Sequence, residues 1–210
     1  MSLIDISPAL RVGMAVFPGD ADYRVAQTFT IGPGCPVNVG SFAMSTHCGA
    51  HADAPLHYDA EGASIDQLDI GDFIGPARVI DARGNDPRCH FDEIAAALDG
   101  APTRLLFRLA DRIDPMVWPS GFRSLSADMV ERLALRGTRL IGVDVPSVDP
   151  ETSKDLPSHM ACRRHDVRIV ENLVLADVEP GDYELIALPL KLEGLDAAPL
   201  RAVLRRPPRQ

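Results

Sequence analysis

The sequence predicts a single α/β domain that is rich in strands and has a few helices. The chain has 210 residues, which is between one and two average domains of ~150 residues. Hydrophobic residues make up 46% and charged residues 24% of it, as is usual for a folded globular protein. Its 18 prolines and 16 glycines are spread along the chain and do not form a linker. We therefore expect one domain over residues 1–210.

Short runs rich in β-branched and apolar residues, separated by turn residues, are predicted to be strands. In chain order they are Leu3–Ile6, Phe42–Thr46, Ala77–Ala82, Leu105–Leu109, Leu140–Val145, Arg168–Glu171, Tyr183–Leu190 and Arg201–Leu204. Two segments, Phe91–Leu98 and Ala127–Arg136, have helical periodicity instead. Ser126 is a candidate N-cap of the second, and Gly137 follows its end. A third helix is expected to begin near Ser158.

Charge and hydropathy exclude several classes of partner. With 21 basic and 30 acidic residues the net charge is -9, which argues against binding to nucleic acid or to an anionic membrane. No apolar run approaches the ~18 residues of a membrane span, and Asp5 and Pro8 interrupt the region where a signal peptide would be apolar. The 4 cysteines include no C-x-x-C pair. We expect a cytoplasmic protein with reduced cysteines.

Histidines are concentrated in one short segment. His47, His51 and His57 lie close together in the sequence, with Asp53 among them. All four positions are odd-numbered, so an extended chain would place these side chains on one side. A fully extended segment from the first to the last histidine would, however, cover about 33 Å. The segment must therefore curl for these side chains to meet, and a glycine and a proline within it permit such bends.

Imidazoles and a carboxylate are a ligand set suited to zinc or manganese, and a site with open coordination positions can activate water. His47 and His51 have the spacing of the zincin motif H-E-x-x-H, but Cys48 stands where that motif has its general base. A structural zinc site would use mainly cysteines, and only Cys48 is near. The pattern therefore favours a catalytic metal site.

The segment His47-Cys48-Gly49-Ala50-His51-Ala52-Asp53-Ala54-Pro55-Leu56-His57 resembles the H-x-G-T/A-H-x-D-x-P-x-H signature of the metal-dependent cyclase-like amidohydrolases. Within that family the chain is most similar to the bacterial kynurenine formamidases. The likeness continues through the segments Ile4–Pro8, Pro18–Asp20, Tyr58–Gly62, Leu140–Ser147 and Gly181–Leu190. The resemblance implies the cyclase-like swivelling β/β/α fold.

The resemblance also implies two zinc ions per subunit, with manganese as a possible alternative. One ion would be held by His47, His51, Asp53 and Glu171, and the other by Asp53, His159 and Glu171. His159 and Glu171 rest on the resemblance alone, although both residue types suit such a site. His57 matches the family's general acid/base, and an ordinary histidine pKa of about 6.5 suits proton transfer near neutral pH.

The implied reaction is hydrolysis of N-formyl-L-kynurenine to L-kynurenine and formate, in tryptophan degradation, by a homodimer. One departure concerns the substrate pocket, because Phe17 stands where the formamidases usually have a tryptophan that lines it. Because the phenylalanine ring is smaller, hydrolysis of another amide substrate, such as ring opening of isatin, stays an alternative function. A non-catalytic zinc-binding protein is an alternative of a different class, but it would not need His57.

Overall fold

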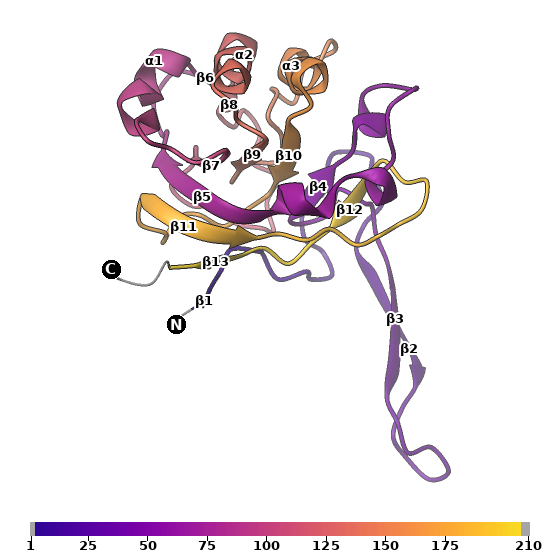
Figure 1. Cartoon of the computed structure of the whole chain (residues 1–210). Coiled ribbons are helices and arrows are strands. Elements are labelled where there is room, and N and C mark those ends of the chain that lie inside the picture. The colour runs from indigo at the N-terminus through magenta and orange to yellow at the C-terminus, as the bar shows by residue number, and fades with distance from the viewer. Residues whose placement is uncertain (1–2, 207–210) are drawn as a thin grey trace.

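Apolar segments far apart in the sequence meet in one large sheet (Figure 1). The computed structural model describes residues 3–206. In this part of the chain 9 strands are joined in the order β1 (Leu3–Asp5), β13 (Val203–Arg205), β11 (Gly181–Ile186), β5 (Ile74–Asp81), β7 (Arg104–Arg108), β9 (Leu140–Val143), β10 (Arg168–Glu171), β4 (His51–Asp53) and β12 (Ala197–Pro199). The four strands from β5 to β10 are parallel, and those on either side are antiparallel.

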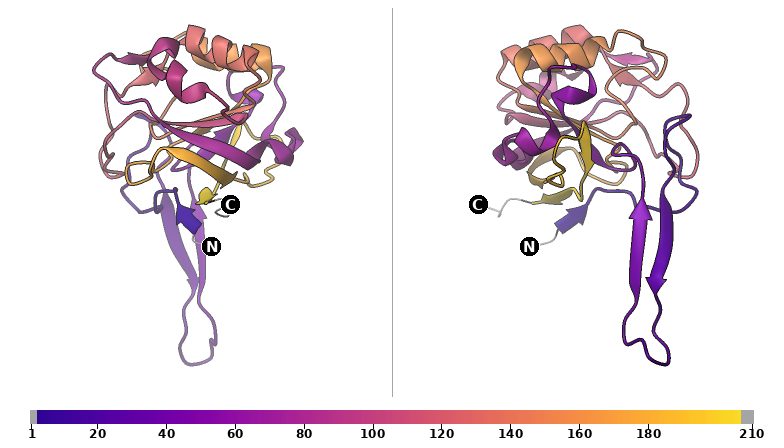
Figure 2. Two further views of the ribbon diagram at one scale, coloured as in Figure 1. Left: turned by 60° about the vertical axis from the view of Figure 1, so that its left-hand side comes forward. Right: turned by 90° about the vertical axis from the view of Figure 1, so that its right-hand side faces the viewer.

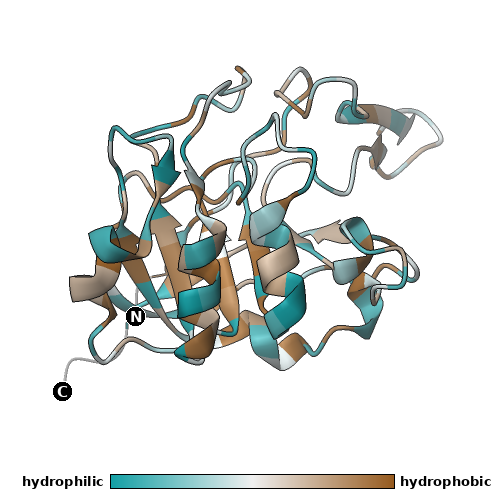
Figure 3. Cartoon of the chain, turned by 90° about the horizontal axis from the view of Figure 1, so that it is seen from above, coloured by the Kyte–Doolittle hydropathy of each residue, from teal (hydrophilic) through white to brown (hydrophobic). Residues whose placement is uncertain are grey.

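Three helices cover one face of this sheet (Figure 1). They are α1 (Phe91–Ile94), which continues as a 3₁₀ turn over Ala95–Leu98, α2 (Ala127–Leu135) and α3 (Pro157–His165). Along β7, Leu105 and Phe107 join the core beneath the helices, whereas Leu106 joins the core on the opposite face. This alternation follows from the two-residue period of a strand. Seen from the helix side, the strands beneath are largely hydrophobic, whereas the helices carry both hydrophilic and hydrophobic residues (Figure 3).

Two further strand pairs lie outside this sheet. β6 (Arg88–Cys89) and β8 (Ser124–Leu125) form a short parallel pair. β2 (Arg24–Phe29) and β3 (Val39–Ala43) form an antiparallel hairpin that projects from the body of the molecule (Figures 1 and 2). Every residue of both hairpin strands is exposed. Within residues 3–206 no helix is apolar and long enough to cross a membrane.

The predicted fold class is confirmed, and all three helices form where the sequence places them. The Ser126 hydroxyl accepts a hydrogen bond from the Met129 amide at 3.2 Å, as an N-cap does, and Gly137 has a φ of +92°. The prediction of a strand over Phe42–Thr46 is wrong in position, because β3 ends at Ala43 and the chain then turns. β11 ends at Ile186, well before the predicted Leu190. The strands β2, β4, β6, β8 and β12 were not predicted.

Candidate metal and active site

Strand pairing brings the first three side chains of the site together. β4 and β10 are antiparallel, with His51 directly opposite Glu171. Side chains directly opposite each other in such a pair lie on the same face, and Asp53, two residues after His51, shares that face. Glu171 is the last residue of β10, so the site lies at the carboxyl ends of the parallel strands. Loops that follow such strands commonly form binding sites.

The chain curls on both sides of β4, which is extended over only three residues. His47 lies in a turn in which the Cys48 amide donates to the Ser45 carbonyl at 3.2 Å. Gly49, with a φ of +71°, follows this turn, and a Cβ atom there would lie 2.6 Å from a methyl group of Leu10. On the other side, a 3₁₀ turn over Pro55–His57 turns His57 back toward the strand. The predicted bends are therefore present.

The first turn of α3 supplies His159 from the opposite side of the site. The Asp149 carboxylate accepts hydrogen bonds from the backbone amides of Ser158 and His159, each at 3.0 Å. It also lies 2.8 Å from Nδ1 of the His159 ring. The same carboxylate therefore fixes the start of the helix and the orientation of the imidazole, whose Nε2 lies 3.4 Å from Oδ2 of Asp53.

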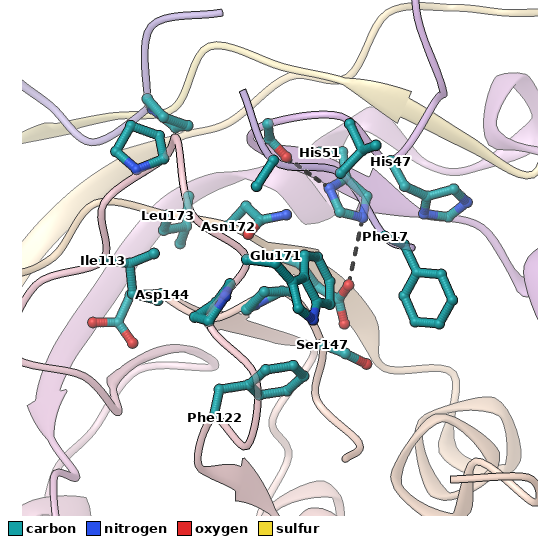
Figure 4. A pocket seen from close by; sticks show the side chains of 18 of the residues that line it. Phe17, His47, His51, Ile113, Phe122, Asp144, Ser147, Glu171, Asn172 and Leu173 are labelled. Atoms are coloured by element: carbon teal, nitrogen blue, oxygen red, sulfur yellow. Dashed lines mark hydrogen bonds and ion pairs between the residues drawn. The ribbon is translucent and has the colours of Figure 1, made fainter. Parts of the chain in front are cut away.

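The Asp53 carboxylate is the centre of the cluster. Its Oδ1 lies 3.2 Å from Nδ1 of His47 and 3.3 Å from Nε2 of His51. His51 Nε2 also lies 3.4 Å from Oε2 of Glu171 (Figure 4). Nevertheless His51 Nε2 and both Asp53 oxygens are buried without a hydrogen-bond partner. Leaving such atoms unpaired is costly, and a cation among them would satisfy all three, so these residues fit a metal ion.

The electrostatics of the buried centre favour a positive charge. Burial lowers the pKa of His51, but the Asp53 and Glu171 carboxylates outweigh this effect and raise it to about 10. Burial likewise opposes protonation of His159, whose pKa the Asp149 and Asp53 carboxylates raise to about 10. Burial raises the pKa of Asp53, yet the surrounding imidazoles hold it well below its usual value. Metal binding would take the place of these protons.

His57 has a different environment from the other imidazoles. Its side chain is 32% exposed, against 1% for His51 and 2% for His159. Its ring centroid lies 4.1 Å from that of His47 and 5.9 Å from that of His159. Burial and the neighbouring His47 and His159 lower the pKa of His57, against the opposing charges of Asp53 and Glu171. A neutral imidazole therefore stands beside the cluster at neutral pH.

A cavity of about 930 Å³ opens beside the cluster and is lined by His47, His51, His57, His159 and Glu171. Phe17, Trp118 and Phe122 also line it. Phe17 is 53% exposed, so it is not a core residue, and it lines the same cavity as His47 (Figure 4). The Trp118 ring lies edge-on to Phe17, with centroids 5.6 Å apart, and its Nε1 donates to Glu151 at 2.7 Å. Two loops distant in sequence thus form an aromatic wall.

The structure therefore brings together all the site residues that the sequence analysis predicts. The cluster contains His47, His51, Asp53, His57, His159 and Glu171. Phe17 lies on the wall of the adjoining cavity. Three other residues of the site were missed. Trp118 and Asp149 carry no spacing signal that ties them to the histidine segment. Asp196, a lone acidic residue just before β12, lies 2.9 Å from Nε2 of His47, and only the pairing of β12 with β4 brings it there.

The chain is similar to known proteins in both sequence and structure. The family model named Cyclase matches residues 4–150. A kynurenine formamidase of Delftia acidovorans is 53% identical over 203 residues, which are 97% of this chain and 97% of that protein. A solved structure described as a potential metal-dependent hydrolase with cyclase activity has a TM-score of 0.83 at 28% identity, covering 98% of this chain and 99% of the other.

A second solved structure bears on the fold alone. Isatin hydrolase A from Ralstonia solanacearum has a TM-score of 0.83 at 21% identity, and the match covers 97% of this chain and 91% of that one. The fold is therefore shared with hydrolases of more than one named activity.

Proposed function

The chain belongs to the Cyclase family, and on that basis we propose that it is a metal-dependent amidohydrolase that converts N-formyl-L-kynurenine to L-kynurenine and formate. One observation carries the choice of reaction: the 53% identity to a kynurenine formamidase extends over 97% of both chains. The isatin hydrolase shares the fold at only 21% identity, so the alternative reaction has weaker support.

Two zinc ions are the proposed metal content, with manganese as the alternative. His47, His51, Asp53 and Glu171 would hold one ion, and Asp53, His159 and Glu171 would hold the other. The carboxylates of Asp53 and Glu171 support this division, because each has one oxygen toward His51 and the other toward His159. Oδ1 of Asp53 faces His47 and His51 while Oδ2 faces His159, and Oε2 of Glu171 faces His51 while Oε1 lies 3.7 Å from His159. Shared anionic ligands reduce the repulsion between two cations.

Bound metal ions supply Lewis acidity, which lowers the pKa of water and stabilises negative charge on a carbonyl oxygen. His57 then performs the proton transfers. Its neutral imidazole takes a proton from the attacking water, and the resulting imidazolium gives a proton to the departing aryl amine. Phe17 and Trp118 would contact the aromatic ring of the substrate from the cavity wall, where edge-on and stacked ring contacts are favourable.

A homodimer is the proposed assembly, with the β2–β3 hairpin as its contact. Apolar side chains on and beside this hairpin are between 41% and 62% exposed: Val25, Phe29, Ile31, Val37, Val39 and Phe42. An isolated two-stranded hairpin is marginally stable in water, and exposed apolar patches of this kind commonly mark protein interfaces. A second copy of the chain would cover the apolar side chains of the β2–β3 hairpin. The cytoplasmic location expected from the sequence stays a prediction.

Removal of metal tests the proposed function. Treatment with a chelator should abolish hydrolysis of N-formyl-L-kynurenine, because the Asp53 cluster would lose its cation, and added zinc or manganese should restore it. Metal analysis and an absorbance assay measure both effects, with isatin assayed in parallel. Full turnover by metal-free protein would overturn the mechanism, and faster turnover of isatin would overturn the choice of substrate. A fully metallated protein without turnover of either compound would be a zinc-binding protein only.

A further inference from the structure

The buried imidazoles of the cluster share one arrangement. In His51, Nδ1 lies 2.9 Å from the carbonyl oxygen of Gly49, and Nε2 faces Asp53. In His159, Nδ1 lies 2.8 Å from the Asp149 carboxylate, and Nε2 again faces Asp53. One nitrogen of each ring is thus anchored from outside, and the other faces the centre. Such outer hydrogen bonds fix the orientation and the tautomer of a metal-binding histidine.

The other two imidazoles share a single anchor. Oδ2 of Asp196 lies 2.9 Å from Nε2 of His47 and 3.4 Å from Nδ1 of His57. The nitrogen of His47 that faces Asp53 is Nδ1, on the other side of its ring. Asp196 therefore lies outside the cluster and contacts a proposed metal ligand and the proposed acid/base at once.

The backbone holds Asp196 firmly in this place. Its carbonyl oxygen accepts a hydrogen bond from the Ala54 amide at 2.8 Å, and the next residue, Ala197, pairs with Asp53. Its second carboxylate oxygen accepts a hydrogen bond from the Thr46 hydroxyl at 3.1 Å. The backbone of Asp196 is thus tied to the segment that carries Asp53, and its carboxylate to Thr46, which limits its freedom to move relative to the two rings.

We propose that Asp196 is a positioning residue that sets the tautomers of His47 and His57, an inference that rests on the function proposed above. An ionised carboxylate only accepts hydrogen bonds. It therefore keeps a hydrogen on Nε2 of His47 and on Nδ1 of His57. The lone pairs are then left on Nδ1 of His47, which faces Asp53, and on Nε2 of His57, which can accept a proton from water.

Asp196→Asn is the direct test, since the amide keeps the size of the side chain but can donate a hydrogen to either ring and favour the wrong tautomer. We expect kcat for N-formyl-L-kynurenine to fall about 10- to 100-fold, with KM changed less than about twofold, because Asp196 does not line the cavity. The zinc affinity of the metal-free protein should also fall about 10- to 100-fold, whereas the metal content at saturating zinc stays unchanged. Asp196→Glu, which keeps the acceptor, should recover part of both losses.

The matched control is Asp66→Asn, because Oδ1 of Asp66 accepts from the Gly194 amide in the same loop but contacts no histidine. It should leave kcat and zinc affinity unchanged. Equal losses in both variants would mean that any disturbance of the loop suffices, and would overturn the proposal. Loss of metal from Asp196→Asn at saturating zinc would make Asp196 a ligand instead. Wild-type kinetics and affinity would exclude any role.

Histidine side-chain ¹H–¹⁵N spectra provide a readout that does not depend on activity. They should show the Nδ1–H tautomer of His57 in the wild type and a change in Asp196→Asn. If the wild-type protein does not hydrolyse the formamide, the proposed function fails, but the spectra and the zinc titration still decide the role of Asp196. An unchanged His57 tautomer in the variant would overturn the proposal even if the rate falls.

Discussion

At the scale of single residues, the histidines of one cluster have opposite electrostatic environments. The pKa of His51 and that of His159 are raised to about 10 by carboxylates despite burial, whereas the pKa of His57 is lowered by burial and by neighbouring imidazoles. The rings lie within a few ångströms of the same aspartate, so proximity alone does not set their properties. What differs is the number of carboxylate contacts that each ring makes.

This difference predicts different results for two alanine variants. His57→Ala should keep its metal but lose about 10²- to 10⁴-fold in kcat, the usual contribution of general acid–base catalysis. His47→Ala should lose metal as well as activity, because Nδ1 of His47 faces the unpaired Oδ1 of Asp53. Elemental analysis and steady-state kinetics measure both. The assignment is reversed if the His57 variant is depleted of metal and the His47 variant is not.

The buried carboxyl group of Asp144 leads to a second prediction, which concerns how the stability of the fold depends on pH. This carboxyl is 6% exposed, and its burial raises the pKa from 3.8 to about 7, although backbone amides, including that of Leu109, donate to it. Between these values the folded state holds a proton that the unfolded state has lost, so the group destabilises the fold increasingly as pH rises from about 4 to about 7.

Asp144→Asn, which mimics the neutral acid, should therefore become more stable relative to the wild type as pH rises. Across pH 5 to 7 we expect a relative gain of about 2 kcal/mol, since one pH unit in this window is worth about 1.4 kcal/mol. Urea denaturation of both proteins at the two pH values measures it. A stability difference that does not vary with pH would show that Asp144 is ionised in the folded protein.

At the scale of elements, the 3₁₀ turn over Pro55–His57 depends on a glycine that follows it. A Cβ atom at Gly62 would lie 2.4 Å from the carbonyl carbon of Pro55 and 2.6 Å from the backbone nitrogen of Leu56. These atoms belong to the turn that positions His57, and backbone cannot yield as a flexible side chain can. The close approach therefore couples a residue outside the site to the placement of His57, the proposed acid/base.

Gly62→Ala should displace this turn and lower kcat at least about tenfold, since small displacements of a catalytic group are costly. Metal content should stay unchanged, because His47, His51 and Asp53 lie before the turn. Glu61→Ala, at the adjacent exposed position, is the control and should behave as the wild type. Normal turnover by Gly62→Ala would mean that the turn moves without displacing His57.

Local signals predicted some elements and missed others for physical reasons. The helix α2 was found because Ser126 and Gly137 mark its ends and its apolar residues have helical period. β4 has only three residues, and its partners lie far along the sequence, so no local pattern reveals it. The hairpin strands β2 and β3 are exposed throughout, so they lack the alternation by which strands are recognised, and β2 was missed while β3 was predicted only in part and out of position. Asp196 was missed because only strand pairing brings it to His47 and His57.

At the scale of the whole molecule, the projecting β2–β3 hairpin predicts a dimer that charged substitutions on the hairpin should dissociate. The double change Val25→Asp and Phe42→Asp places carboxylates on paired residues that are 57% and 62% exposed. Burying them in an interface would be unfavourable, so the dimer should dissociate at micromolar concentration. Light scattering after size-exclusion chromatography measures the mass. Leu135→Asp, at a residue that is 78% exposed on α2, should not change it, and a monomeric wild type would contradict the proposal.

The insertion of β4 between β10 and β12 has a consequence for synthesis of the chain on the ribosome. The register partners of Asp53 are Ile169 and Ala197, so the segment with three histidines emerges long before either flanking strand exists. Sheets closed by such distant pairings form only when the later segments arrive. A chain that stops before α3 therefore carries His47, His51 and Asp53 but cannot order them. The ordered arrangement of these three side chains would then exist only in the completed polypeptide.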